Sequence, residues 1–154
     1  MIVDGYNVIH AWGLDTRNLE DARERLLHIL DDYAGFSGED ITVVFDGYNT
    51  KEPMSETRQG LLTIVYTAYG VTADTHIQRA VKAGKRAVKV VTADYLEQLS
   101  VFEAGAVRIT PGELKVLIKD AREKHIKHMD RSSLSGKELK KMLALDAISL
   151  PDQL

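Results

Sequence analysis

The chain has 154 residues, of which 44% are hydrophobic and 28% charged, a size and composition typical of one globular domain and not of a disordered chain. It contains no cysteine, which excludes disulfide frameworks and thiolate metal sites, and no apolar run approaches the ~20 residues of a membrane-spanning helix, so we expect a soluble, cytoplasmic protein. The formal net charge of −3 excludes the uniformly basic surface of a general nucleic-acid binder.

Short apolar runs rich in β-branched residues predict strands that are buried on both faces of a sheet. These runs occupy residues 1–3, 41–45, 61–66 and 88–91. Between them, apolar residues recur at helical spacing, with Asn18 and Thr72 as N-caps of the first two segments and glycine close behind each segment. The predicted helices cover residues 19–33, 73–83 and 94–104. This alternation predicts a mainly parallel sheet with right-handed crossovers.

The last third of the chain is predicted to be helical. The stretch TPGE at residues 110–113 is a capping box with proline at the first helical position, and it predicts a helix to about residue 128. Residues 130–136 break this pattern, and a second capping box predicts a short helix over 137–145. We therefore expect one domain over residues 1–129 and a C-terminal helical tail over 130–154.

The sequence Asp-Gly-Tyr-Asn follows an apolar run twice, and Thr-Ala-Asp follows two further runs. Four aspartates thus lie at strand exits: Asp4, Asp46, Asp74 and Asp94. In an open parallel sheet these exits share the carboxyl edge, where ligands bind at the switch in strand order. Four carboxylates gathered there repel one another unless a cation neutralises them, and the hard ions Mg²⁺ and Mn²⁺ prefer oxygen ligands. The pattern predicts a divalent metal site.

Each of these residues also has a plainer interpretation. A single aspartate at a strand end often forms a turn or caps a helix, and the helix dipole favours Asp74 in a first helical turn in any case. Asn7 either orients a water or phosphate, or caps the turn. Gly5 and Gly47 suit tight turns that let backbone or ligand approach closely, and the polar stretch over residues 47–60 is predicted to be a loop.

Several motifs, in order along the chain, carry a resemblance to a known family. They are MIVDGYNVIHAW, LEDARERLLHILDDYAG, ITVVFDG, ETRQG followed by TIVYT, GVTADTHI and VVTADYLEQ. Over roughly residues 1–125 the chain resembles the YacP-like NYN-domain proteins, which are PIN-like bacterial nucleases and include a ribosome-associated endoribonuclease that cuts mRNA. The resemblance implies a PIN-like α/β/α sandwich with a mainly parallel central sheet and an appended C-terminal helix. It also implies metal-dependent RNA cleavage, with family motifs matched by Asp4, Asn7, Asp46, Asp74 and Asp94.

RNA would be guided by basic and aromatic side chains. Residues 115–141 hold nine Lys/Arg against four Asp/Glu, a local charge of +5. Such a segment can follow phosphates, although lysines and arginines also commonly decorate solvated helix faces. Tyr48, in a polar segment beside Asp46, is a candidate for stacking on an unpaired base. Candidates for contacting the RNA backbone are Lys51, Arg58, Lys82, Lys85, Arg86 and Lys89.

The resulting hypothesis is an endoribonuclease that cleaves mRNA in association with the ribosome. The four aspartates would hold one or two Mg²⁺ or Mn²⁺ ions, which activate a water for in-line attack on the phosphodiester, and Asn7 would position water or phosphate. A ribosome- or RNA-binding module with little or no catalysis is the main alternative. A receiver-type signalling domain also carries strand-end acids around Mg²⁺, but Asp4-Gly5 lacks the adjacent acidic pair usual after its first strand.

Overall fold

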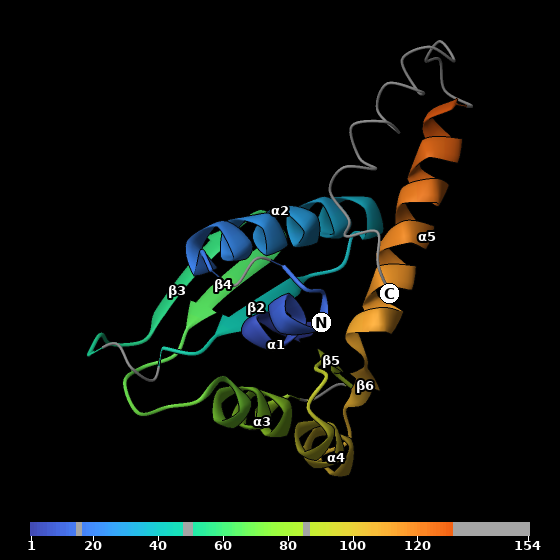
Figure 1. Cartoon of the computed structure of the whole chain (residues 1–154). Helices are drawn as coiled ribbons and strands as arrows, with labels where there is room; N and C mark the ends of the chain where they lie inside the picture. Colours follow the sequence, from blue (N-terminus) through green and yellow to red (C-terminus); the bar gives the residue numbers. More distant parts are fainter. Residues whose placement is uncertain (15–16, 48–50, 85–86, 131–154) are drawn as a thin grey trace.

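The computed structural model describes residues 1–14, 17–47, 51–84 and 87–130, and within them the chain forms one sheet with helices on both faces (Figure 1). The strands are β1 (Ile2–Asp4), β2 (Ile41–Phe45), β3 (Ser55–Gln59), β4 (Leu62–Tyr66), β5 (Lys89–Val91) and β6 (Val107–Ile109). The helices are α1 (Gly5–Ala11), α2 (Leu19–Ser37), α3 (Ala73–Ala83), α4 (Tyr95–Glu103) and α5 (Pro111–Asp130). None of these described helices combines the length and the apolar character needed to cross a membrane.

The sheet has the strand order β3-β4-β2-β1-β5-β6. Neighbouring strands are parallel except for β3, which runs antiparallel to β4, so the predicted mainly parallel sheet is confirmed. The chain leaves β1 to form β2 on one side and later returns to the other side of β1 as β5. The boundary between β1 and β5 is therefore the switch in strand order, and ligands of such sheets bind at the carboxyl ends of the strands beside it.

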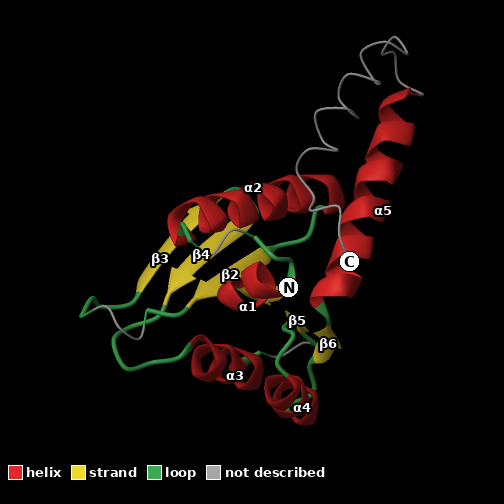
Figure 2. Ribbon diagram, viewed as in Figure 1, coloured by secondary structure: helices red, strands yellow, loops and turns green. Residues whose placement is uncertain are grey.

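Helices cover the sheet in two layers (Figure 2). One hydrophobic core packs α1, α2 and α5 against one face, and a second core packs α3 and α4 against the other. Because successive strand residues point to opposite faces, Val43 and Phe45 of β2 belong to the first core and Val44 belongs to the second. The predicted α/β/α sandwich is thus confirmed, and α5 packs beside the C-terminal end of α2, while the predicted helical tail lies outside the described residues except for residue 130.

Local capping explains where the long helices begin. Asn18 and Thr72 cap α2 and α3 by accepting hydrogen bonds from backbone N–H groups of the first turn. In the predicted capping box of α5, the Glu113 N–H donates to Thr110 Oγ1 and the Thr110 N–H donates to Glu113 Oε2. These bonds from Thr110 lower the pKa of Glu113. The stability that this carboxylate contributes is therefore present above its unfolded pKa and is lost as the pH falls through the folded one.

The sequence patterns do not predict three elements of the structure: α1, β3 and β6. Every residue of β3 is exposed, so no alternation of apolar residues marks this strand, and the predicted loop over residues 47–60 is wrong at Ser55–Gln59. β6 has three residues, two of them exposed, at the other edge of the sheet. Both are edge strands whose pairing depends on backbone hydrogen bonds to one neighbour and not on burial of two faces.

Gly5 begins α1, and packing requires its lack of a side chain. A Cβ atom built on Gly5 lies 2.3 Å from Cε1 of Phe45. Phe45 is fully buried, and its ring centroid lies 5.2 Å from that of Tyr6 and 5.3 Å from that of Tyr66. The ring therefore has no free space to move into. Gly5 makes room for a core aromatic ring at the start of a helix, which corrects the expectation of a tight turn open to a ligand.

Gly5→Ala should consequently destabilise the fold. Overpacking a filled core costs about 1–3 kcal/mol, so the free energy of unfolding measured by urea denaturation should fall by that amount. Gly35→Ala is the matched control, because Gly35 lies inside α2 and its added Cβ meets no atom within 4 Å. The control should gain up to about 1 kcal/mol from helix propensity. A Gly5→Ala protein as stable as the wild type would contradict the packing argument.

Candidate active site

A side-chain hydrogen bond joins the carboxyl ends of β1 and β5. β1 ends at Asp4, which is buried, and its Oδ1 accepts a hydrogen bond from the Asn7 N–H at 3.2 Å, capping α1. The Asn7 side chain reaches across the switch in strand order, where its Oδ1 accepts a hydrogen bond from the Ala93 N–H. Asn7 thus positions backbone on both sides of the switch, and it holds Asp4 and the loop that carries Asp94 at one place.

Asp94 lies directly before α4 and is exposed. Its Oδ1 accepts a hydrogen bond from the Leu96 N–H at 2.8 Å, and its own N–H donates to Thr92 Oγ1 at 3.1 Å. Thr92 is fully buried at the end of β5, and its carbonyl accepts a hydrogen bond from Gln98 Nε2 at 2.8 Å. The carboxylate is therefore held at the N-terminal end of α4, where the helix dipole favours negative charge.

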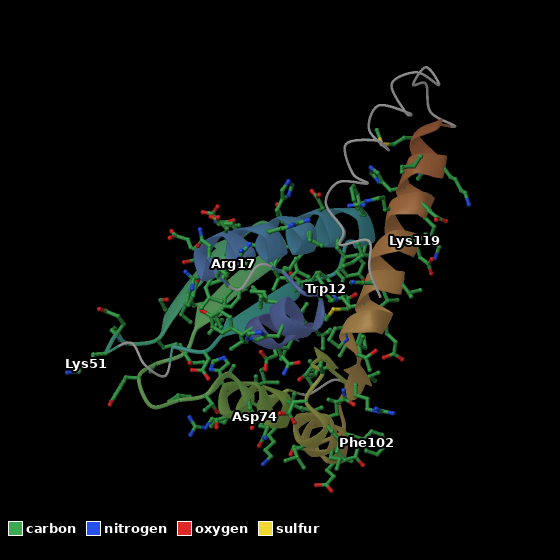
Figure 3. All side chains as sticks on the ribbon, viewed as in Figure 1. Trp12, Arg17, Lys51, Asp74, Phe102 and Lys119 are labelled. Atoms are coloured by element: carbon green, nitrogen blue, oxygen red, sulfur yellow. The ribbon has the colours of Figure 1, made fainter. Side chains whose placement is uncertain are left out.

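Asp74 lies in the first turn of α3 (Figure 3). Gln78 Nε2, one turn later, donates to both carboxylate oxygens of Asp74, at 2.9 and 3.0 Å, while Thr72 caps the helix. The two Thr-Ala-Asp sequences therefore differ in local role. In the first the threonine caps the helix, and in the second Asp94 occupies the capping position.

Asp46 directly follows β2, next to β1 at the same carboxyl edge. The N–H of Gly47 donates to Thr67 Oγ1 at 2.8 Å, and the Thr67 hydroxyl donates to the Val71 carbonyl at 2.6 Å. Thr67 thus ties the ends of β2 and β4 together and orders the chain around Asp46. The sequence interpretation missed both buried threonines, although each directly follows a predicted strand, where an otherwise unpaired backbone needs a polar partner.

The four aspartates share one edge without forming a closed set of ligands. Among the residues that the structure describes, no three His, Cys, Asp or Glu side chains are placed to hold a metal ion together. The donors at this edge are carboxylate and amide oxygens, which match the preference of Mg²⁺ and Mn²⁺. The donor chemistry therefore fits a hard divalent cation, and the set of residues that ligate it stays a prediction.

Two of the predicted RNA-contacting cations lie at the opposite, amino edge of the sheet. Arg58 pairs there with Asp40, with 2.9 Å between Nη2 and Oδ1, and Lys89 pairs with Glu39, with 3.0 Å between Nζ and Oε1. These exposed ion pairs join the segment before β2 to β3 and β5. The structure does not bring Arg58 or Lys89 to the strand-end aspartates.

The other predicted RNA-contacting residues are scattered. Lys82 is exposed in the last turn of α3, away from the carboxyl edge. Lys51 is exposed in the connection that precedes β3, on the carboxyl side of the sheet (Figure 3). Tyr48, Lys85 and Arg86 lie outside the described residues, as does the predicted helix over 137–145.

A cation that the sequence interpretation missed lies close to the carboxyl edge. Arg23 of α2 donates from Nη1 to the Tyr6 hydroxyl at 2.9 Å, and this bond raises the pKa of Arg23. Tyr6 follows Asp4 by two residues, and burial raises the pKa of the neighbouring Tyr66. Arg23 is thus a positive charge held by the Tyr6 hydroxyl near the end of β1. Its position on the flank of an amphipathic helix gives no indication of this role in the sequence.

The three-layer α/β fold with its mainly parallel sheet is that of a PIN-like protein, a class whose members are generally nucleases. More narrowly, the chain belongs to the YacP-like NYN domain family, whose model matches residues 1–150. The family model thus matches a longer part of the chain than the motifs do, since the motifs show the resemblance over roughly residues 1–125.

Known relatives agree with this assignment. The chain is 31% identical over 121 residues to the uncharacterized protein YacP of Bacillus subtilis (strain 168), with 74% of this chain and 71% of that protein covered. A crystal structure of Rae1 (YacP) from Bacillus subtilis matches with a TM-score of 0.69 and 28% identity, covering 96% of this chain and 88% of that one. A crystal structure of a point mutant of Rae1 matches with a TM-score of 0.67 and 26% identity, covering 98% and 92%.

Asn7→Ala should loosen the connection between β1 and β5. Loss of the acceptor for the Ala93 N–H should lower the free energy of unfolding by about 1 kcal/mol and accelerate hydrogen exchange of the Ala93 amide, which NMR measures. Asn18→Ala is the control, because it removes the α2 cap at a comparable cost of about 1 kcal/mol and leaves the Ala93 contact in place. Equal exchange of the Ala93 amide in Asn7→Ala and wild type would refute this role.

Proposed function

We propose that the protein is a divalent-metal-dependent endoribonuclease that cleaves mRNA in association with the ribosome. The observation that carries the proposal is the Asn7 bond across the switch in strand order, which connects the end of β1 at Asp4 to the loop before α4, at the edge where ligands of such sheets bind. Membership of the YacP-like NYN family supports the nuclease chemistry. The choice of RNA and of the ribosome as partner rests on the resemblance of the sequence motifs to that family.

In this proposal the strand-end carboxylates hold one or two Mg²⁺ or Mn²⁺ ions. These residues are Asp4, Asp46, Asp74 and Asp94. When bound, such an ion activates a water for attack and stabilises the charge that develops on the phosphodiester. Asp74 and Asp94 accept hydrogen bonds from Gln78 and from the N-terminal turn of α4, and such bonds would orient the carboxylates as ligands.

The remaining groups at the edge bind and orient RNA. Asn7 fixes the separation of the ends of β1 and β5, and the N-terminal ends of α3 and α4 direct positive helix dipoles at the same edge. Arg23, held by Tyr6, offers a guanidinium to a backbone phosphate, a group that arginine binds with two parallel hydrogen bonds. Lys51 extends the positive charge along the exposed connection before β3.

A second candidate function is RNA binding with little or no catalysis. It is favoured by the structural roles of Asp74 and Asp94, whose carboxylates already accept hydrogen bonds within their own helices. In this alternative the acids shape the loops, and Arg23 and Lys51 still contact the phosphates. Metal-dependent turnover separates the two candidates, because only the nuclease requires the carboxylates to bind a cation.

Asp4→Asn provides the sharpest test of the nuclease. Asparagine keeps an oxygen at the position that caps α1, so thermal stability should be unchanged or slightly higher, whereas loss of the charge weakens cation binding. Cleavage of an RNA substrate in Mg²⁺ or Mn²⁺ should fall by at least about 10- to 100-fold. The measurements are the cleavage rate on gels, mapping of the new 5′ ends, and the melting temperature.

Asp120→Asn is the matched control, because Asp120 is exposed on α5, away from the strand ends. It should cleave like the wild type. Chelation by EDTA should abolish cleavage of the isolated RNA by wild-type protein. Full activity of Asp4→Asn, or cleavage that persists in EDTA, would overturn the proposed site, and RNA binding without any cleavage would favour the second candidate.

The role of the ribosome is tested by the same pair of proteins. Wild type and Asp4→Asn are incubated with translating ribosomes in Mg²⁺, and the 5′ ends of the mRNA are mapped. Faster cleavage on translated than on free mRNA, absent in Asp4→Asn, is the expected result. Equal rates on translated and free mRNA would remove the ribosome from the proposal and leave the nuclease chemistry intact.

A further inference from the structure

α4 exposes an unusual number of large apolar side chains. Tyr95, Leu96, Leu99 and Phe102 are 68%, 73%, 43% and 64% exposed. The opposite side of this helix packs into the second core through Val101, which is fully buried. An apolar cluster of this kind on the surface of a small domain marks an interaction site.

Three of these side chains line a groove beside the edge of the sheet. Tyr95, Leu99 and Phe102 form it together with Gln98 of α4 and Arg108 of β6, and its volume is about 310 Å³. Phe102 is labelled in Figure 3, on the side of α4 that faces away from the sheet. The groove thus combines two exposed aromatic rings, an aliphatic wall and one cation, and none of the described residues that line it is a carboxylate.

We propose that this groove binds an unpaired stretch of the RNA substrate, with bases stacked on Tyr95 and Phe102 and a backbone phosphate at Arg108. This inference rests on the proposed function and assigns to it a second contact region outside the strand-end carboxylates. Aromatic rings stack on any unpaired base because every base has a π face, and an arginine beside them supplies the charge for the backbone. Duplex RNA does not expose its bases in this way.

Continuity with the candidate active site selects RNA over other occupants. Tyr95 directly follows Asp94, so the groove begins where the strand-end carboxylates end. Gln98 links the two regions: its amide donates to the Thr92 carbonyl at 2.8 Å, and its Oε1 accepts a hydrogen bond from Arg108 Nη1 at 2.9 Å. The groove is therefore held in a fixed position relative to the end of β5. An RNA strand that runs from the cleavage site into the groove requires such a fixed position.

Charge complementarity also favours RNA over a second copy of the chain. Among the described residues that line the groove, Arg108 is the charged one, and the chain as a whole has a net charge of −3, so attraction to a polyanion has to come from local cations of this kind. A self-interface would bring the Arg108 guanidinium groups of both copies into an apolar contact, where burying a charge is costly. Self-association is therefore the outcome that the experiment must separate from RNA binding.

The test measures binding of fluorescent RNA of about twelve nucleotides, single-stranded or annealed, to the full chain by anisotropy. All proteins carry Asp4→Asn so that the RNA stays intact. Adding Tyr95→Ala or Phe102→Ala should weaken binding of the single strand by about 5- to 100-fold each and leave binding of the duplex unchanged. Arg108→Gln should reduce the slope of log affinity against log salt by about 0.7, the value for one phosphate contact on a single strand.

Two variants serve as matched controls. Tyr95→Phe keeps the ring and should bind like its parent, and Leu96→Ala removes an exposed apolar side chain that lies on α4 but does not line the groove. Unchanged single-strand affinity in both Tyr95→Ala and Phe102→Ala overturns the inference. So does a shift from dimer to monomer in sedimentation velocity without a change in RNA affinity, which assigns the groove to a second copy.

Wild-type cleavage distinguishes failure of the groove from failure of the proposed function. If wild type cleaves RNA and the groove variants bind normally, the groove is wrong and the nuclease stands. If wild type neither binds nor cleaves RNA, both proposals are wrong. Loss of single-strand binding in the two ring variants, with Tyr95→Phe and Leu96→Ala intact, supports the groove.

Discussion

The hydrogen bond from the Ala93 N–H to the Asn7 side chain holds the two halves of the sheet together at their carboxyl ends. β1 and β5 are three-residue strands, and their ladder has only the pairs Ile2↔Val90 and Val3↔Val91. The backbone pairing between β1 and β5 therefore ends at Val3 and Val91, before Asp4 and Thr92. Asn7 continues the connection with a side chain, and the positions of Asp4 and of the loop before α4 both depend on it.

The carboxylates at this edge have structural roles of their own, apart from any role in catalysis. Asp4 and Asp94 cap the helices that follow their strands, and Asp74 is held by Gln78 in the first turn of α3. Helix dipoles and N–H donors favour the negative charge of each acid separately, which lets several acids lie near one another. A carboxylate can accept such hydrogen bonds and bind a divalent cation at the same time, so the donors that shape the helix starts would also orient the acids as ligands.

α4 connects the candidate active site to the surface. Its N-terminal end carries Asp94, its inner side packs Val101 into the core, and its outer side presents aromatic and aliphatic groups beside Arg108. Gln98 joins these parts because its amide donates to the end of β5 and its oxygen accepts from β6. Amphipathic helices normally turn a polar side to water. The apolar outer side of α4 departs from this pattern, and it is the surface to which we assign RNA binding.

The sequence by itself determined the central strands and the caps at Asn18 and Thr72, because burial on both faces and capping are local properties that short patterns record. Only the tertiary structure decided the edge strands, the reason for Gly5, and the placement of Arg58 and Lys89 at the amino edge. Edge pairing, ring packing and the position of a surface cation depend on strand order and on residues distant in the chain, and no local pattern contains them.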